Sequence, residues 1–225
     1  MKKILGKSKR NKTIRKTKVS HPKQQSLTEK LMTLDSSSTI DEFVKLPEGE
    51  DKNEWIALNT FDFFGAVQSF YEMMFEICTP ETCKTMSIDS YECQWKCEDG
   101  TMTSLSAMEY IDKALNYCQE QLDNPKIFPM EIGAQFSDKF IPRIRIMYKR
   151  MFRIYGHFYF HHLDALKSLE VERHLNTSFK RFICFSAEFK LIEKREVEPM
   201  KNVLNNLIPG LFEKFEPFEK KKSLK

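Results

Sequence analysis

Apolar side chains recur at helical spacing through most of the chain after residue 52. The clearest stripe lies between residues 53 and 77, where apolar positions follow one another at steps of 7, 4, 3, 4 and 3: Ile56, Phe63, Val67, Phe70, Met74 and Ile77. Such steps place side chains on one face of a helix. Similar patterns predict helices over about 107–123, 138–169, 177–191 and 199–207. We therefore expect an all-α fold with a four-helix-bundle core and additional helices.

Residues 88–104 break this helical pattern. Tyr91–Trp95 has the character of a strand, and Glu98-Asp99-Gly100 is a strong turn signal after which the chain can return. We expect one β-hairpin here. Immediately after it, Ser106 and Glu109 have the spacing of a capping box, which predicts the start of the next helix.

Positive charge is concentrated at the N-terminus. The net charge is +4, and residues 1–25 hold ten Lys or Arg and no acid, so residues 26–225 carry a net charge of −6. We interpret residues 1–25 as a disordered basic arm, residues 26–210 as a single helical domain and residues 211–225 as a Lys-rich tail. The arm could bind nucleic acid, an anionic membrane or the acidic domain itself. The absence of Phe, Tyr and Trp from the arm argues against nucleic acid.

The sequence carries no pattern of export or membrane insertion. No apolar run approaches the roughly 18 residues of a membrane-spanning helix, and the basic N-terminus lacks the apolar segment of a secretory signal. The six cysteines are therefore expected in a reducing compartment, where they serve as metal ligands or buried thiols more often than in disulfides. We expect the protein in the cytoplasm and also in the nucleus.

Two cysteines and a histidine cluster have the spacing of a metal site. Cys78 and Cys83 form a C-x₄-C pair of the kind found in zinc half-sites, and His157 with a second histidine could complete a Cys₂His₂ set. Ideal helix geometry favours His161 as the second histidine, whereas His162 needs a local distortion. Four protein ligands would make the site structural, because no position stays open for a substrate. The alternative is two buried thiols beside interfacial histidines.

Two helix faces carry charge that could recognise a partner. Lys149, Arg150 and Arg153, here called the basic triad, lie three and four residues apart, so they project from one side of a helix and can surround a dianion such as phosphate. An acidic stripe with an apolar centre lies beside Trp55 and is a candidate docking surface for a basic partner. The stripe comprises Asp51, Glu54, Leu58 and Asp62. The alternative for each face is an ordinary solvated helix surface.

Motifs of catalysis are absent from the sequence. It lacks a phosphate-binding G-x-x-x-x-G-K-[ST] loop, a G-x-S-x-G elbow and an H-E-x-x-H metal helix. Glu81 could act as a base in a metal-dependent hydrolase only if one of the four metal ligands were missing. Cys93 and Cys97 flank Trp95 without a second histidine pair to complement them, so we interpret them as structural.

Segments spread over about residues 26–210 match the pattern of one protein family. The segments are Leu46–Asp51, Asn53–Ala57, Asn59–Phe64, Cys78–Cys83, Ser106–Ala107 with Tyr110–Asp112, Lys149–Tyr155, His157–His162 and His174–Lys180. Together they resemble the Mob (Mob/phocein) family, and the last segment is similar to its Hippo and mitotic-exit branch. The resemblance implies a four-helix bundle with a structural zinc ion, whose ligands would be Cys78, Cys83, His157 and His162.

The same resemblance implies a non-enzymatic coactivator of NDR/LATS-type kinases, found also at spindle poles or the cell cortex. Family members use the basic triad as a phosphopeptide pocket for phosphorylated Ste20-like (MST-type) kinases. The NDR/LATS-type kinase would bind an acidic surface, which here comprises Glu50, Glu54, Trp55, Leu58 and Asp62. Thr13 and Thr33 are the nearest matches to two phosphorylated threonines of the family. The alternative within the family is a phocein-like adaptor of a striatin phosphatase assembly.

Overall fold

The computed structural model describes residues 44–131 and 133–218. The predicted basic arm at residues 1–25 lies outside the described residues, as do Thr13, Thr33 and residues 219–225 of the predicted tail. Within the described ranges, no helix is both long and apolar enough to cross a lipid bilayer.

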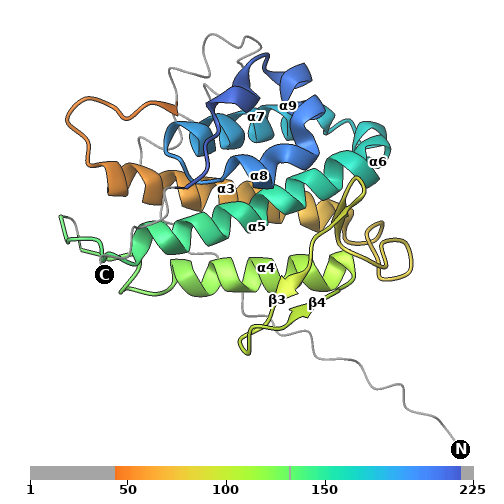
Figure 1. Ribbon diagram of the computed structural model, residues 1–225, viewed down its shortest axis with the longest axis horizontal. Helices are drawn as coiled ribbons and strands as arrows, with labels where there is room; N and C mark the ends of the chain where they lie inside the picture. The colour runs from red at the N-terminus through yellow and green to blue at the C-terminus, as the bar shows by residue number, and fades with distance from the viewer. Residues whose placement is uncertain (1–43, 132, 219–225) are drawn as a thin grey trace, which may run out of the picture. The chain divides into compact units, whose positions relative to one another are not determined.

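Four helices form the core of the described structure (Figure 1). They are α3 (Lys52–Met74), α4 (Ala107–Leu122), α5 (Phe140–His161) and α7 (Glu172–Glu188). Helix α5 contacts each of the other three, and α3 also contacts α4 and α7. The predicted all-α fold with a four-helix core is therefore confirmed. Helix α5, which carries the basic triad and the histidines, is the element that the other three share.

Aromatic side chains fill the space between α3, α5 and α7. The rings of Tyr148 and Tyr155 on α5 each lie 5.2 Å, centroid to centroid, from the ring of Phe182 on α7. Phe63 of α3 meets Phe182 edge to face at 5.4 Å. Burying one such side chain contributes about 1.5–3 kcal/mol, and a ring pair adds about 0.5–1.5 kcal/mol. This cluster therefore fixes the position of α5 between the other two helices.

Capping side chains set the starts of α3 and α4. The carboxylate of Asp51 accepts hydrogen bonds from the backbone N–H groups of Asn53 and Glu54 at 2.8 and 3.0 Å. The hydroxyl of Ser106 accepts from the N–H of Glu109 at 3.3 Å, and the Glu109 carboxylate accepts from the N–H of Ser106 at 3.0 Å. The predicted capping box is therefore confirmed. Each cap satisfies N–H groups that have no partner inside the helix.

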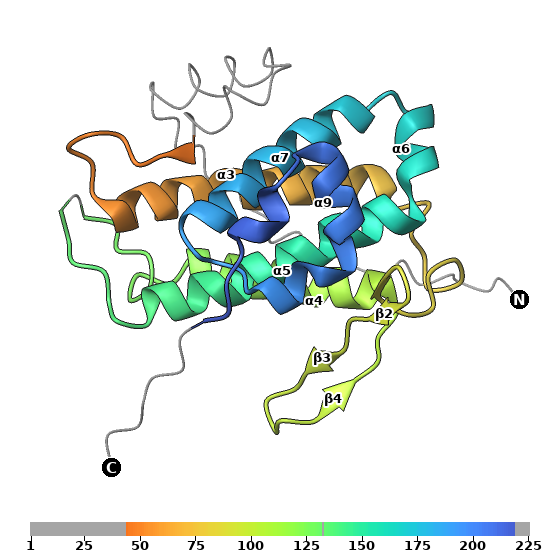
Figure 2. The ribbon, with the colours of Figure 1, turned by 45° about the horizontal axis from the view of Figure 1, so that its top comes forward.

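The segment predicted as a single β-hairpin forms two shorter hairpins. The four strands are β1 (Ser87–Ile88), β2 (Tyr91–Glu92), β3 (Trp95–Lys96) and β4 (Met102–Thr103), with β1 antiparallel to β2 and β3 antiparallel to β4. The predicted hairpin is confirmed in β3 and β4, and the chain forms an additional turn before it, at Asp89 with a φ of 51°, after Ile88 has packed on α5. The strand-like run 91–95 is thereby divided between two partners. Figure 2 shows β3 and β4 projecting from the helices.

A break at His162 divides the helix predicted over residues 138–169. His162 has a φ of −131° and a ψ of 8°, outside the helical region, and α6 (Leu163–Ser168) follows it directly. The N-cap residue of α5 is Lys139, whose side chain forms no capping hydrogen bond. The break changes the direction in which His162 leaves the backbone.

The last described segment packs on the bundle. It contains α8 (Lys194–Val197), the 3-10 helix η1 (Glu198–Met200), α9 (Lys201–Leu207) and the 3-10 helix η2 (Leu211–Lys214). Leu211, Phe212 and Phe215 are at most 3% exposed, and η2 contacts α7. Packed chain therefore continues past residue 210, where the sequence predicts the end of the helical domain.

Candidate functional site

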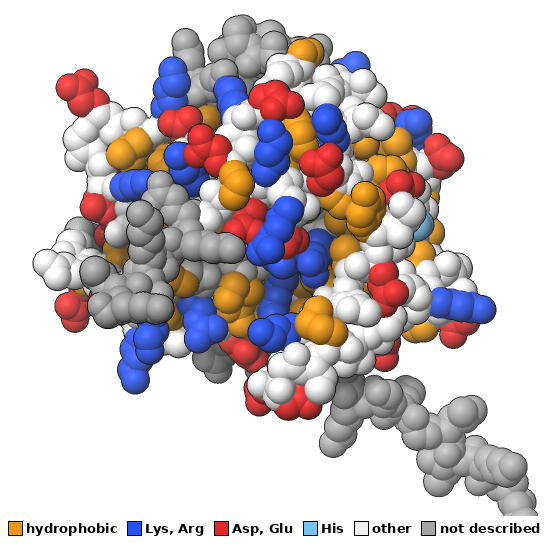
Figure 3. All heavy atoms as spheres, in the orientation of Figure 1, with side chains coloured by type: hydrophobic (Ala, Val, Ile, Leu, Met, Phe, Trp, Pro, Cys, Tyr) orange, Lys and Arg blue, Asp and Glu red, His pale blue; other side chains and the backbone are white. Residues whose placement is uncertain are grey.

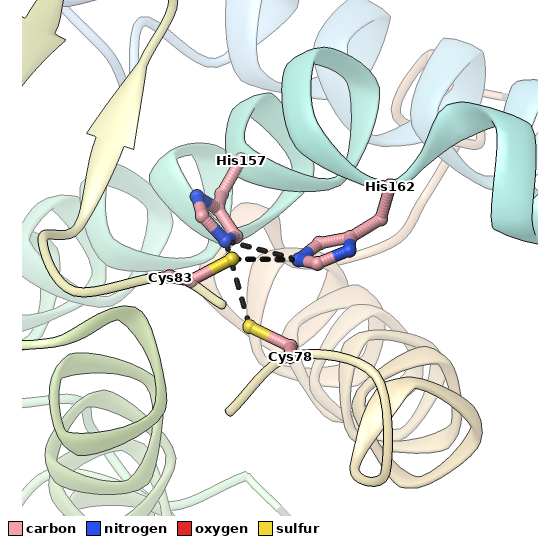
Figure 4. Close-up of side chains that lie close together, drawn as sticks. All are labelled: Cys78, Cys83, His157 and His162. Atoms are coloured by element: carbon pink, nitrogen blue, oxygen red, sulfur yellow. Dashed lines mark hydrogen bonds between the residues drawn. The ribbon is translucent and has the colours of Figure 1, made fainter. Parts of the chain in front are cut away.

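Two cysteines beyond the end of α3 face two histidines at the end of α5 (Figure 4). The N–H of Cys78 still donates to the C=O of Met74, at 2.7 Å, so this cysteine is held by the last turn of α3. Cys83 closes the following loop, in which its N–H donates to the C=O of Thr79 at 2.8 Å. His157 lies on α5 and His162 is its C-cap residue. Only the packing of α3 on α5 brings these segments together.

The four donor atoms have the separations of a tetrahedral zinc site. Sγ of Cys78 lies 3.5 Å from Nε2 of His157, and Sγ of Cys83 lies 3.4 Å from Nε2 of His162. The two Nε2 atoms are 3.2 Å apart. Zinc bonds of about 2.3 Å to sulfur and about 2.0 Å to nitrogen, at tetrahedral angles, put such pairs roughly 3.5 and 3.3 Å apart. The donors, all within 4.8 Å of one another, therefore fit one metal ion.

Neighbouring groups set the protonation states of His157 and Cys78 in this cluster. The C=O of Ser87 in β1 accepts a hydrogen bond from Nδ1 of His157 at 3.1 Å, which leaves the lone pair of Nε2 free to bind a metal. Burial lowers the pKa of His157 to about 3, so the imidazole is neutral, the form that binds metals. Burial and the neighbouring Cys83 raise the pKa of the Cys78 thiol to about 12. A divalent cation would supply the positive charge that a thiolate needs here.

The structure brings His162, and not His161, into this cluster. Because the helix ends after His161, His162 turns toward the cysteines, while Nε2 of His161 lies 2.9 Å from the hydroxyl of Ser87. The preference for His161 from ideal helix geometry is therefore wrong, and the four clustered residues are those that the family resemblance implies. Four protein donors leave no open coordination position, so Glu81 has no metal-bound water to activate.

The basic triad lies on the face of α5 beside α8, where Figure 3 shows Lys and Arg side chains gathered. Nζ of Lys149 donates to Oε1 of Glu196 at 2.6 Å, and Nη2 of Arg153 donates to Oε2 of the same carboxylate at 3.3 Å. Nη1 of Arg153 also donates to the hydroxyl of Tyr110 at 3.0 Å. Two cations of the triad therefore share one carboxylate, which α8 supplies.

Sequence reasoning missed Glu196. It lies 43 residues after Arg153, in a short segment whose sequence shows no periodic pattern. Its pairing with Lys149 and Arg153 is therefore seen only in the folded chain. Burial alone would raise the pKa of Glu196, but the hydrogen bond from Lys149 and the charges of Lys149 and Arg153 outweigh burial and lower the pKa. The carboxylate is therefore ionised at neutral pH and offsets part of the charge of the triad.

Arg150 has a different environment from the other two cations. Its guanidinium carbon lies 4.0 Å from the ring centroid of Trp95 and 3.8 Å from that of Tyr117. Each such cation–π contact contributes about 0.5–2 kcal/mol. Nη1 of Arg150 is buried and has no hydrogen-bond partner in the described parts of the chain. Burial lowers the pKa of Arg150, yet a guanidinium stays charged in proteins, so this cation retains unused donors.

The predicted acidic surface lies on and before the first turns of α3. Glu50 and Glu54 are exposed, and Trp55 and Leu58 are half-buried between them and the core. The indole N–H of Trp55 donates to the C=O of Val44 at 3.3 Å, which fixes the ring in place. The surface therefore combines exposed carboxylates with a fixed Trp side chain, a residue type enriched among the side chains that contribute most to binding at protein interfaces.

Asp62, the last member of this acidic surface, is also an internal partner. Its carboxylate accepts a hydrogen bond from Nη2 of Arg181 on α7 at 3.2 Å, and the same nitrogen donates to the side-chain oxygen of Asn59 at 2.6 Å. Asp62 therefore helps to hold α7 against α3, and its charge is less available to a partner than that of Glu50 or Glu54.

Comparison with known proteins identifies the family. The family model described as Mob1/phocein family matches residues 32–200. The chain belongs to the Mob1/phocein family. It is 41% identical over 177 residues to MOB kinase activator-like 1B of Arabidopsis thaliana, covering 76% of this chain and 81% of that protein. It is also 41% identical over 176 residues to Maintenance of ploidy protein mob1 of Schizosaccharomyces pombe, covering 76% of this chain and 83% of that protein.

The other cysteines of this Mob chain have local contacts. Cys93 is buried, and its thiol lies 4.0 Å from the C=O of Tyr91. Sγ of Cys97 lies 3.4 Å from the hydroxyl of Thr103 across β3 and β4. Over residues 44–131 and 133–218, the cluster described above is the one group of side chains arranged to hold a metal. Cys93 lies between the two hairpins and Cys97 directly after β3, and the two cysteines belong to no metal-binding group among the described residues.

Proposed function

We propose that this Mob1/phocein family member is a non-enzymatic coactivator of a protein kinase. Relatives named kinase activators, from Arabidopsis thaliana and Medicago sativa subsp. falcata, support this role. The observation that carries it is the presence of two recognition surfaces of opposite charge on one bundle, the acidic surface on α3 and the basic triad on α5. The closed metal cluster between their helices offers no reactive position. Such a protein joins partners and does not transform a substrate.

The metal would be a structural Zn²⁺ held by Cys78, Cys83, His157 and His162. It would fasten the end of α3 to the end of α5, so that the two surfaces keep one relative position. Structural zinc can contribute on the order of 10 kcal/mol to folding. Metal analysis should find about one zinc per chain, and X-ray absorption should find two sulfur and two nitrogen neighbours. A folded chain that purifies without zinc would overturn this assignment.

The acidic surface would bind a basic segment of an NDR/LATS-type kinase. Its support is the exposure of Glu50 and Glu54 beside the fixed ring of Trp55. Reversing both charges, with Glu50→Arg and Glu54→Arg, should abolish binding and activation of such a kinase, because a basic segment would then meet like charge. Glu72→Arg, at an exposed position further along α3, is the matched control. Unchanged activation by the double variant, or recovery of a striatin assembly without a kinase, would contradict the proposal.

The basic triad would dock a phosphorylated Ste20-like kinase. A phosphothreonine carries a charge of about −1.5 to −2 and accepts several hydrogen bonds, which suits the unused donors of Arg150. Calorimetry with a phosphothreonine peptide should show binding that the unphosphorylated peptide lacks. Replacing Lys149, Arg150 and Arg153 with Ala should remove it, whereas Arg173→Ala, at an exposed site on α7, should not. Equal affinity of the triple variant, checked for retained zinc and helicity, would refute the pocket.

A further inference from the structure

Positive charge on the triad face is unevenly compensated. Lys149 and Arg153 both pair with Glu196, at 2.6 and 3.3 Å, so one negative charge already serves two of the three cations. Arg150 forms no ion pair with any carboxylate in the described ranges. Arg150, on the side of the triad away from Glu196, is therefore the member of the triad most available to pair with an external anion.

Tyr117 of α4 links Arg150 to a fourth cation. One face of its ring stacks on the guanidinium of Arg150, at 3.8 Å from the ring centroid. Its hydroxyl accepts a hydrogen bond from Nη1 of Arg143, at 3.3 Å. Arg143 is exposed and, like Arg150, has no carboxylate ion pair among the described residues. The side chain of Tyr117 therefore contacts two guanidinium groups that have no carboxylate partner among the described residues.

The spacing of these two cations suits an extended peptide. Arg143 and Arg150 both contact the ring of Tyr117, so their guanidinium groups lie closer together than the roughly 10.5 Å that separates their backbone positions on α5. An extended chain advances about 3.3–3.6 Å per residue and its alternate side chains share one face, so residues two apart present side chains about 7 Å apart to the same surface. Ile146 lies between the two cations on the same face and is 38% exposed, which offers an apolar contact to the peptide.

We propose that Arg143, Tyr117 and Arg150 extend the phosphate site along α5 into a track for two anions. The peptide that docks there carries, besides its phosphorylated residue, an acidic side chain two residues away, on the same face of the extended chain. The phosphate contacts Arg150 within the triad, and the carboxylate contacts Arg143. This inference rests on the phosphopeptide binding proposed above and adds the sequence preference of that site.

Calorimetry with three phosphothreonine peptides tests the track. One peptide has Glu two residues before the phosphothreonine, one has Glu two residues after it, and one has Gln at both positions. One of the two Glu peptides should bind about 1.5–5-fold more tightly than the Gln peptide, the usual size of one exposed charge pair. Testing both positions is required because the direction of the peptide along α5 decides which of them reaches Arg143.

Substitutions of Arg143 test whether this side chain causes the preference for Glu. Arg143→Gln should remove the preference for Glu, weakening the favoured Glu peptide more than the Gln peptide, and Arg143→Lys should retain most of the preference. Arg173→Gln, the same loss of charge on α7, should preserve it. Equal affinity for all three peptides, or an equal loss for all three in Arg143→Gln, would overturn the track while leaving phosphopeptide binding intact. If none of the peptides binds, the proposed phosphate site fails and the track fails with it.

Discussion

Gly156 provides a sharp test of how β1 is packed against α5. It lies in the helix beside His157, and a Cβ atom added there would lie 2.7, 2.9 and 3.0 Å from three side-chain atoms of Ile88. Real Cβ contacts are longer than this, so Ile88 would have to move. Ile88 is 1% exposed and cannot swing into solvent. Ser87, the preceding residue of β1, accepts the hydrogen bond from His157, so any displacement of β1 reaches the metal cluster.

The expected size of the effect follows from two opposing contributions. Replacing Gly with Ala inside a helix stabilises it by up to about 1 kcal/mol, whereas overpacking a filled core costs about 1–3 kcal/mol. All three contacts involve the same buried side chain, so overpacking should win. We expect Gly156→Ala to lower the free energy of unfolding by about 1 kcal/mol, the difference between the two contributions.

A double-mutant cycle isolates the contact. Ile88→Ala alone should cost about 2–5 kcal/mol, but it removes all three atoms that the new methyl group would meet. In that background Gly156→Ala should become neutral or stabilising. Denaturant titration of the four proteins in a buffer of fixed free zinc measures the coupling. If Gly156→Ala changes stability equally in both backgrounds, or stabilises the otherwise unchanged chain, the close packing of β1 on α5 is refuted.

Three further predictions concern the cluster, the triad and a cap. His162→Ala should lose the metal and lower the melting temperature, whereas His161→Ala should retain about one metal per chain; the reverse order in metal analysis would contradict the cluster. Glu196→Gln should be less stable than the unchanged chain at pH 7. The folded-state pKa of Glu196 is lowered from 4.5. The difference in stability between the two proteins should therefore be largest above pH 4.5 and should disappear as the pH falls through the folded-state pKa. A difference that denaturant titrations find independent of pH would refute the pairing. Ser106→Ala should cost about 1 kcal/mol, and Ser106→Thr, which keeps a hydroxyl that can accept from the N–H of Glu109 and donate to its carboxylate, should restore most of it; equal loss in both would contradict the capping role.

Local patterns account for the parts of the structure that could be predicted. The stripe from Ile56 to Met74 and the capping box of Ser106 with Glu109 depend on contacts within a few residues, so they are readable before the chain folds. The C-x₄-C pair and the basic triad are likewise local spacings. Local spacing was therefore enough to predict the segments that make up the metal cluster and the charged surfaces.

The sequence by itself determined the helices, their main caps and the residue types that can hold a metal or an anion. The tertiary structure decided which of these groups meet. His162 replaces His161 because α5 ends where the chain turns toward Cys83, 79 residues away in sequence. Glu196 pairs with Lys149 across 47 residues because α8 packs beside α5. Periodicity carries information over a turn or two of helix, whereas these partners are set by the packing of whole elements.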